Sequence, residues 1–257
     1  IQLAVQIPVA QHLGFRWRWR WRHAGSGEVL KLLIPRTLGA AVYQGSVLVH
    51  TALASLAGIM GDGAVVALYF ANRLVQLPLA LFGSASAQAS LPSLAEQAGT
   101  NDLQGFRATL LSVIRMASFV TLPSAVGLMV LAFPIVGGLF ERGAFDHRAT
   151  VMTSQALICY ALGLLAYACS KIVSGAFYAV RDTWTPVKLA IEAVVVNILL
   201  SLLLMWPLQT MGLALSAACA NTLNAARLLR RLERRLGEPL LRPDLAELCR
   251  RAKKLKF

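Results

Sequence analysis

The segment AVVVNILLSLLLMWPLQTMGLALSAACANTLNAA, residues 193–226, runs for 34 residues without a charged side chain. A helix needs about 20 mostly apolar residues to cross a membrane, so this segment is long enough for two spans. Trp206-Pro207 and Gly212 interrupt it near its middle, and proline and glycine favour turns. We therefore predict one spanning helix over residues 186–206 and another over residues 210–230.

Four more apolar segments precede this one. They are residues 37–60, 63–95, 116–140 and 149–180, and only Arg73 and Lys171 interrupt them with a charge. The sequence therefore predicts a six-helix transmembrane lobe over residues 31–232. Residues 1–13 are interpreted as the end of a preceding transmembrane helix.

The composition of the whole chain agrees with a membrane protein. Apolar residues make up 57% of the 257 residues and charged residues 14%, against about 25% charged residues in soluble domains. A soluble domain of this size cannot bury that much apolar surface, and disorder requires low hydrophobicity. The short alternating segments of a membrane β-barrel are absent. The fold class that we predict is an all-α, polytopic transmembrane helix bundle.

The basic residues predict how the spans are oriented. With residues 14–30 placed in the cytoplasm, 20 of the 25 Lys and Arg residues fall on the cytoplasmic side, and only Arg142 and Arg148 fall on the other. This is the positive-inside distribution. Residues 14–30 are then a basic cytoplasmic loop and residues 233–257 a basic cytoplasmic tail. We interpret the tail as a contact for anionic membrane lipids rather than for nucleic acid, because it lacks interleaved aromatic residues.

Arg73 is the charged residue with the clearest functional implication. It lies roughly 15 Å along the second predicted helix, at a depth where an arginine normally faces a cavity or a partner. Gln76 follows three residues later on the same helix face, and Pro78 is expected to bend the helix. A guanidinium beside an amide suits a phosphate-bearing ligand in a central cavity, because it binds phosphate through two hydrogen bonds. The alternative is a structural ion pair with a neighbouring helix.

Three other polar residues fall inside predicted spans. His50 lies midway along the first span, either packed neutral against a neighbour or linked to proton movement. Asn197 and Ser201 are four residues apart, so they share a helix face and are expected to form interhelical hydrogen bonds. No nucleotide-binding, metalloprotease or Ser-His-Asp pattern occurs, and the four cysteines form no CxxC motif. We predict no enzyme activity, no metal and no cofactor.

Several segments, in order along residues 28–230, resemble the MurJ (MviN) family, the lipid II flippases of the multidrug/oligosaccharidyl-lipid/polysaccharide exporter superfamily. The more specific segments are FERGAF at residues 140–145 and FYA-x-x-D-T-x-T-P at residues 177–186. The others are LLIP at 32–35, VYQ at 42–44, ALYFANRL at 67–74, LP at 77–78 and LPSL at 91–94.

The resemblance implies a fourteen-helix transporter whose two lobes surround a central cationic cavity. Such a transporter moves lipid II, the undecaprenyl-diphosphate-linked peptidoglycan precursor, from the inner to the outer leaflet of the bacterial cytoplasmic membrane by alternating access. This chain would correspond mainly to the second lobe, from the end of the sixth helix to about the twelfth. The first lobe is then an expected partner, and the chain is not expected to transport alone.

The resemblance also implies roles for particular residues. Arg73 matches the family's cavity arginine, and Asn72 and Gln76 stand where the family commonly has acids. His50, Asn197 and Ser201 match the positions of a sodium site in some members, and only Asn197 is retained, so we do not expect sodium coupling. These losses leave one alternative function, a degenerate, non-transporting membrane scaffold or lipid-binding paralogue. The FERGAF segment argues against a third, a drug or ion exporter of the same superfamily.

Overall fold

A computed structural model of the protein describes residues 26–56 and 62–236. The chain forms two compact units, residues 1–34 and residues 35–257, and the second holds nearly all of the described structure. The predicted helix end at residues 1–13, most of the predicted loop 14–30 and most of the predicted tail 233–257 lie outside the described residues. The last residues of that loop are helical, because the first described helix begins at Ser26.

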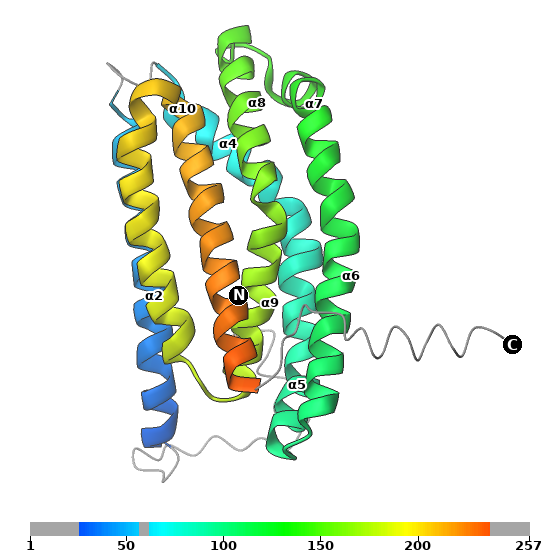
Figure 1. The fold of residues 1–257 in the computed structure, drawn as a ribbon. Coiled ribbons are helices and arrows are strands. Elements are labelled where there is room, and N and C mark those ends of the chain that lie inside the picture. Colours follow the sequence, from blue (N-terminus) through cyan, green and yellow to red (C-terminus); the bar gives the residue numbers. More distant parts are fainter. Residues whose placement is uncertain (1–25, 57–61, 237–257) are drawn as a thin grey trace, which may run out of the picture. The chain divides into compact units, whose positions relative to one another are not determined.

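Every element in the described part of the chain is a helix (Figure 1). In order they are α2 (Ser26–Ala54), α4 (Ala64–Pro78), the π-helix η1 (Leu79–Ser84), α5 (Ala85–Gly99), α6 (Leu103–Val130), α7 (Ala132–Phe140), α8 (His147–Leu162), α9 (Leu164–Ala179) and α10 (Trp184–Leu236). The stretch from α4 to α5, α6 and α10 are each long and apolar enough to cross a membrane, and the bent pair α8–α9 raises this number to as many as four. The predicted all-α transmembrane bundle is confirmed.

The segment that opens the sequence argument forms a helical hairpin. The backbone leaves helical geometry at Gln209, two residues after Pro207, and the two legs of α10 then run side by side in opposite directions (Figure 1). A Cβ on Gly212 would lie 2.2 Å from the carbonyl oxygen of Leu204. Only glycine therefore fits at this turn, which lies where the sequence predicts one.

The third predicted span is longer than the charge-free segment. It comprises α6, which begins at Leu103 rather than near Met116, and α7. The Asp102 carboxylate accepts a hydrogen bond of 2.9 Å from the Gly105 amide and so caps the start of α6. Arg107 and Arg115 consequently lie on the helix. A charge-free run marks the part of a helix that suits hydrocarbon, and the helix itself continues beyond it.

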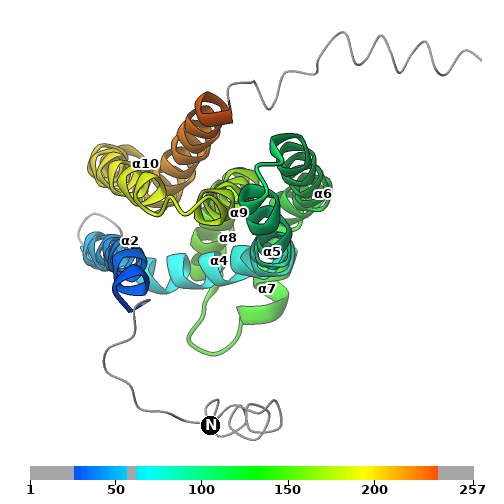
Figure 2. The same ribbon diagram turned by 90° about the horizontal axis from the view of Figure 1, so that it is seen from below.

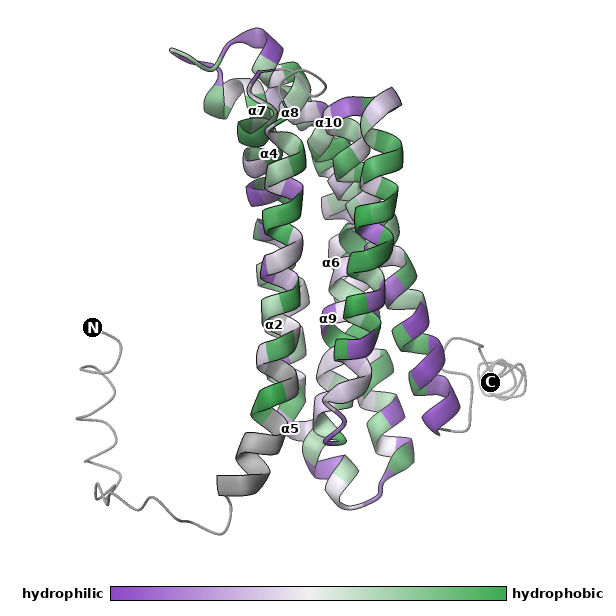
Figure 3. Cartoon of the chain, turned by 90° about the vertical axis from the view of Figure 1, so that its left-hand side faces the viewer, coloured by the Kyte–Doolittle hydropathy of each residue, from purple (hydrophilic) through white to green (hydrophobic). Residues whose placement is uncertain are grey.

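The bent pair α8–α9 stands at the centre of the second unit (Figure 2). Helix α8 packs against α4 and α10, and α9 packs against α5, α6 and α10. Leu157, Leu164 and Leu213 are completely buried in one apolar cluster, and Phe106 and Phe177 are buried in a second. Large apolar side chains such as Phe119, which is 81% exposed, cover the outer faces, as expected where lipid replaces water. Polar residues gather at the end of α10 and in the α7–α8 loop (Figure 3).

Gly163 is where α8 meets α9 at an angle of 46°. A Cβ at this position would lie 2.9 Å from both the Cα and the Cβ of Ala218 in α10. Ala218 lies within a helix, so its Cα and Cβ cannot move aside in the way that the end of a flexible side chain can. The bend is therefore pressed directly against the α10 hairpin, and this contact needs a glycine.

Gly163→Ala is expected to lower the free energy of unfolding by about 1–3 kcal/mol, the usual cost of overfilling a packed core. Gly127→Ala is the matched control, because Gly127 lies within α6 and a Cβ there meets nothing within 4 Å. Alanine at that position should be neutral or stabilising by about 0.5–1 kcal/mol. Denaturant-induced unfolding in lipid nanodiscs measures both variants, and equal effects would contradict the contact described for Gly163.

Asp182 organises the turn between α9 and α10. Its carboxylate accepts hydrogen bonds from the backbone amide of Thr185 at 3.0 Å and from the Thr185 hydroxyl at 2.8 Å, and it forms an ion pair with Arg235. Partial burial raises the pKa of Asp182, but the hydrogen bonds from Thr185 and the charge of Arg235 outweigh it, so that the pKa lies below its ordinary value. The D-T-x-T-P part of the specific sequence segment thus ties the start of α10 to its end.

Asp182→Ala is expected to lower the free energy of unfolding by about 1 kcal/mol at neutral pH, the usual cost of a lost helix cap. Because the folded-state pKa is lowered, the stabilisation is present above the ordinary carboxyl pKa of about 3.9 and is lost as pH falls through the lowered value. Unfolding measured from pH 7 to pH 3 should show the wild type approaching the variant. Asp62→Ala, at an exposed position, should change stability by less than about 0.5 kcal/mol.

Candidate functional site

The sequence of α4 places its polar side chains opposite its packed face. The buried residues recur at helical spacing: Ala64, Ala67, Leu68, Ala71 and Val75. They face α8, with which α4 packs closely. Asn72 and Arg73 fall on the remaining surface and are exposed, and Gln76 is half-buried. Three residues that the sequence predicts as a substrate site therefore share one open side of a membrane helix.

The guanidinium of Arg73 contacts an aromatic ring rather than an acid. Its Cζ lies 5.1 Å from the centre of the Tyr69 ring, one turn earlier in α4. Gln76 donates a hydrogen bond of 3.3 Å from Nε2 to Oδ1 of Asn72. His147, Arg227 and Arg235 form ion pairs in the described part of the chain, and Arg73 takes part in none of these. The structural ion pair that the sequence leaves open for Arg73 is therefore not found in the described part of the chain.

The helix changes its geometry directly after this group. Pro78, which lacks a backbone N–H, ends α4, and Leu79 to Ser84 continue as the π-helix η1. π-Helical turns are uncommon and are often found at functional sites. Gly83 is buried in this turn, where a Cβ would lie 3.3 Å from the Cα of Ala168 in α9. At the position where Pro78 predicts a bend, the structure thus has a wider helical turn packed closely against α9.

A second polar group joins α2 to both legs of α10. Nε2 of His50 lies 2.7 Å from Nδ2 of Asn197 and 3.5 Å from Oγ of Ser201. Ser201 Oγ is 2.7 Å from Ser216 Oγ, which donates to the Leu213 carbonyl at 2.8 Å. The three residues predicted as the remnant of an ion site are therefore brought together. Ser216 completes the group; the sequence argument missed it, because a serine among small residues is ordinary in packed membrane helices.

This second group is poorly suited to a metal ion. Residues 26–56 and 62–236 contain no cluster of three His, Cys, Asp or Glu side chains that could hold one. Hard cations prefer carboxylate and carbonyl oxygens, whereas the atom of His50 that faces Asn197 is a nitrogen. The Oδ1 atom of Asn197 is buried without a hydrogen-bond partner in the described structure, so it is one oxygen of the kind that a cation prefers, but His50 and Ser201 add no carboxylate to it. The imidazole itself bridges α2 and α10.

The FERGAF segment forms an aromatic cluster and a loop at the α7–α8 junction. The Phe70 ring of α4 lies 4.4 Å from that of Phe140 and 5.9 Å from that of Phe145, measured between ring centres. The loop between these two phenylalanines turns at Gly143, whose φ is +61°. The segment therefore fixes the first half of α4 to the end of α7 and to the α7–α8 loop.

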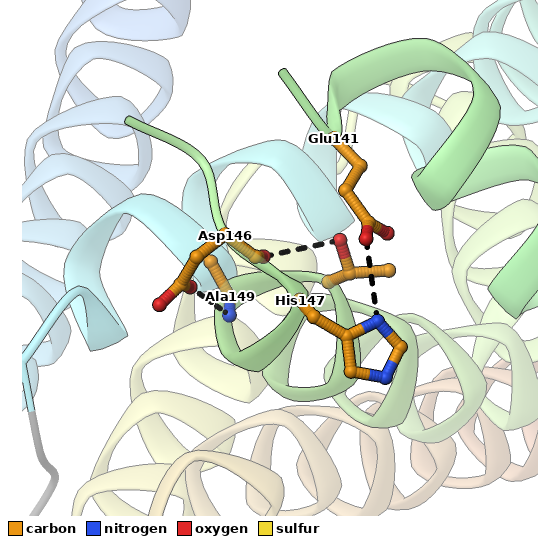
Figure 4. A network of polar contacts seen from close by, with 5 residues as sticks. Glu141, Asp146, His147 and Ala149 are labelled. Carbon is orange, nitrogen blue, oxygen red and sulfur yellow. Dashed lines mark hydrogen bonds and ion pairs between the residues drawn. The ribbon is translucent and has the colours of Figure 1, made fainter. Parts of the chain in front are cut away.

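Polar contacts close the same loop (Figure 4). Glu141 Oε1 lies 3.3 Å from His147 Nδ1, and the Asp146 carboxylate accepts a hydrogen bond of 2.8 Å from the Ala149 amide. Asp146 is thus the N-cap of α8. These contacts hold the loop in place.

Comparison with known proteins identifies the family. A family model described as lipid II flippase MurJ matches residues 1–249. The probable lipid II flippase MurJ of Vibrio cholerae is 36% identical over 208 residues, which cover 81% of this chain and 39% of that protein. The corresponding protein of Haemophilus influenzae is 36% identical over 242 residues, which cover 90% of this chain and 46% of that protein. The chain thus spans less than half the length of these relatives.

Solved structures of transporters also match this chain. A lipid II flippase MurJ in an inward closed conformation matches with a TM-score of 0.69 and 28% identity, over 84% of this chain and 45% of that one. A MATE transporter in a straight conformation matches with a TM-score of 0.77 over 91% of this chain and 54% of that one, at 16% identity, which shows a shared fold alone. The chain is a multi-pass protein of the bacterial inner membrane. Because the family model covers nearly its whole length, the chain belongs to the MurJ family of lipid II flippases.

Proposed function

We propose that this chain forms the second-lobe part of a lipid II flippase. The observation that carries the proposal is Arg73, a permanent positive charge exposed on a membrane-spanning helix with no carboxylate in ion-pair contact in the described structure. A charge at this depth is costly unless it faces a partner or a water-filled cavity. The face of α4 that bears Arg73 is proposed to line the cavity between this lobe and the first.

The chemistry of this face suits a diphosphate. A guanidinium offers five N–H donors in a planar fork and binds phosphate through two of them at once. The amides of Asn72 and Gln76 flank it and are uncharged, so nothing beside Arg73 repels an anion or competes with it. Arg73 is proposed to hold the diphosphate of the lipid-linked precursor, while its sugar-peptide head occupies the hydrated cavity and its acyl tail stays in lipid.

Movement of the two lobes would then carry the head group across the membrane. The first lobe is the required partner, and the activity is transport, with no chemical conversion of the substrate and no cofactor. Arg230, Arg231 and Arg234 are exposed at the end of α10, where polar residues gather in Figure 3. They are proposed to contact anionic lipid head groups rather than nucleic acid.

His50 is proposed to replace an ion at the junction of α2 and α10. The imidazole reaches Asn197 directly at 2.7 Å, so no cation is required to connect the two helices. The uncharged Ser201, completely buried beside it, supplies no negative charge that a cation would neutralise. Transport by this protein is therefore proposed to be independent of sodium.

Arg73→Ala in the full-length gene product is expected to abolish rescue of a strain depleted of its own flippase. The loss of charge-assisted hydrogen bonds should weaken binding of the diphosphate about 10–100-fold. Arg73→Lys keeps the charge without the planar fork and should give partial rescue. Arg115→Ala, which removes an exposed arginine from α6, should rescue fully. Full rescue by Arg73→Ala would remove the basis of the proposal.

Replacing sodium with potassium is expected to leave the transport rate unchanged, because His50, Asn197 and Ser201 provide no carboxylate ligand. The double variant His50→Asp, Ser201→Asp supplies two carboxylates at the same place. Its thermal stability should be higher in sodium chloride than in potassium chloride, whereas that of the wild type should be equal in the two salts. Loss of wild-type transport in potassium would show this part of the proposal to be wrong.

A non-transporting membrane scaffold is the second candidate. It is favoured by Asn72 and Gln76, which stand where the resemblance implies acids, and by His50, which stands at a position of the sodium site found in some members. The same rescue assay separates the two functions. A wild-type full-length product that reaches the membrane but does not rescue the depleted strain is the result that the scaffold predicts.

A further inference from the structure

Three aromatic side chains connect the FERGAF segment to Arg73, namely Phe140, Phe70 and Tyr69. The Phe70 ring packs on Phe140 at 4.4 Å. Phe70 also meets the Tyr69 ring edge-on, with ring centres 5.7 Å apart and planes at 75°. The Tyr69 ring in turn lies beneath the Arg73 guanidinium, with its centre 5.1 Å from Cζ. This series of rings runs from Phe140, at the start of the FERGAF loop, to Arg73, the proposed anion-binding residue.

The neighbouring amides do not compete for the guanidinium. Asn72 directly precedes Arg73, and its Oδ1 already accepts the hydrogen bond from Gln76 Nε2. In the described part of the chain the Tyr69 ring is the group recorded in contact with the Arg73 charge. Tyr69 is one helical turn before Arg73, and residues at this spacing lie next to each other on the helix surface.

An aromatic partner affects a guanidinium differently from an acidic partner. A carboxylate takes up two N–H donors and neutralises the charge. The face of an aromatic ring attracts the cation through its quadrupole and takes up no hydrogen-bond donor in the plane of the guanidinium. Arg73 stacked on Tyr69 is therefore held in place while its charge and its in-plane donors remain free for an anion.

We propose that Tyr69 is a positioning residue of the anion site, and that its ring, supported by Phe70 and Phe140, presents the Arg73 guanidinium to a diphosphate. The inference rests on the proposed function. It names Tyr69 as the residue that orients Arg73, in place of the acids that the resemblance implies at positions 72 and 76. It also gives the FERGAF segment a role in ligand binding, because the aromatic cluster fixes the ring that carries the arginine.

The test measures binding of farnesyl diphosphate, a soluble polyprenyl diphosphate, to the full-length protein in nanodiscs. Tyr69→Phe keeps the ring and should bind with unchanged affinity. Tyr69→Leu keeps apolar bulk without the quadrupole and should bind about two- to fivefold more weakly, the range expected for an exposed cation–π pair. Tyr43→Leu is the control, since Tyr43 is similarly exposed on another helix, α2; it should bind like the wild type.

A series of fluorinated phenylalanines at position 69 separates electrostatics from packing. Each added fluorine withdraws charge from the ring face and leaves its shape almost unchanged, so affinity should fall stepwise from Phe to trifluoro-Phe. A flat series would overturn the proposal, as would an equal loss in Tyr69→Phe and Tyr69→Leu. The series also remains decisive if Tyr69→Leu fails to fold, because its members are nearly isosteric.

Two further measurements distinguish this inference from the proposed function. In an Arg73→Gln background Tyr69→Leu should cause no additional loss of affinity, and an undiminished loss would show that the ring acts without Arg73. The ring should also shift the NMR resonance of the Arg73 Nε–H in unliganded protein, and an identical resonance in Tyr69→Leu would overturn the contact. If Arg73→Ala binds the probe and rescues cells normally, the proposed function fails instead, and the NMR comparison still decides on the contact.

Discussion

Hydrocarbon offers no hydrogen bonds, and this constraint governs the whole structure. Backbone groups must be satisfied within each segment, so every regular element of the described chain is a helix. Between helices the same solvent gives no hydrophobic driving force, and close backbone contacts take its place. Gly163 against Ala218 and Gly83 against Ala168 are such contacts. They fix the central pair α8–α9 against α10 and η1. The packed faces of α4 and α10 therefore determine the direction in which the polar residues on the other faces of these helices point.

The lengths of the charge-free segments predicted the fold well, because the thickness of the hydrocarbon layer sets how long a spanning apolar segment must be. The hairpin of α10 could be predicted from the 34 uncharged residues together with Pro207, since a break there is favoured by both length and backbone chemistry. Helix ends could not be predicted in the same way. Helix α6 begins at Leu103, where Asp102 caps it, and a helix that extends out of the membrane tolerates Arg107 and Arg115. The π-helix after Pro78 also escaped prediction, because proline indicates an irregularity without specifying its form.

The site residues differ in the same way: some of their contacts join residues close together in the sequence, and others join residues far apart. Arg73 and Gln76 were predictable as a pair because helical spacing places them on one face. The meeting of His50 with Asn197 joins residues far apart in the chain, and only the resemblance to a family suggested it. Ser216 and Tyr69 carried no signal of their own. Serine and tyrosine are ordinary in membrane helices, and their importance here comes from what they touch, namely Ser201 and Arg73.

The two polar groups share one property, because neither is built on a carboxylate. Positions 72 and 76 hold amides that bond to each other, and positions 50 and 201 hold an imidazole and a hydroxyl. In both groups side chains contact each other directly, at positions where the resemblance to the family implies acids or, in some members, a sodium site. A carboxylate in hydrocarbon is costly unless it is paired, so a polar group without one avoids that cost but needs another interaction to orient its side chains. The Tyr69 ring beside Arg73 and the Asn197 amide beside His50 are proposed to supply this orientation without a negative charge. A cavity face proposed to carry Arg73 without an acid has a net positive charge, which favours binding an anion over exchanging a cation.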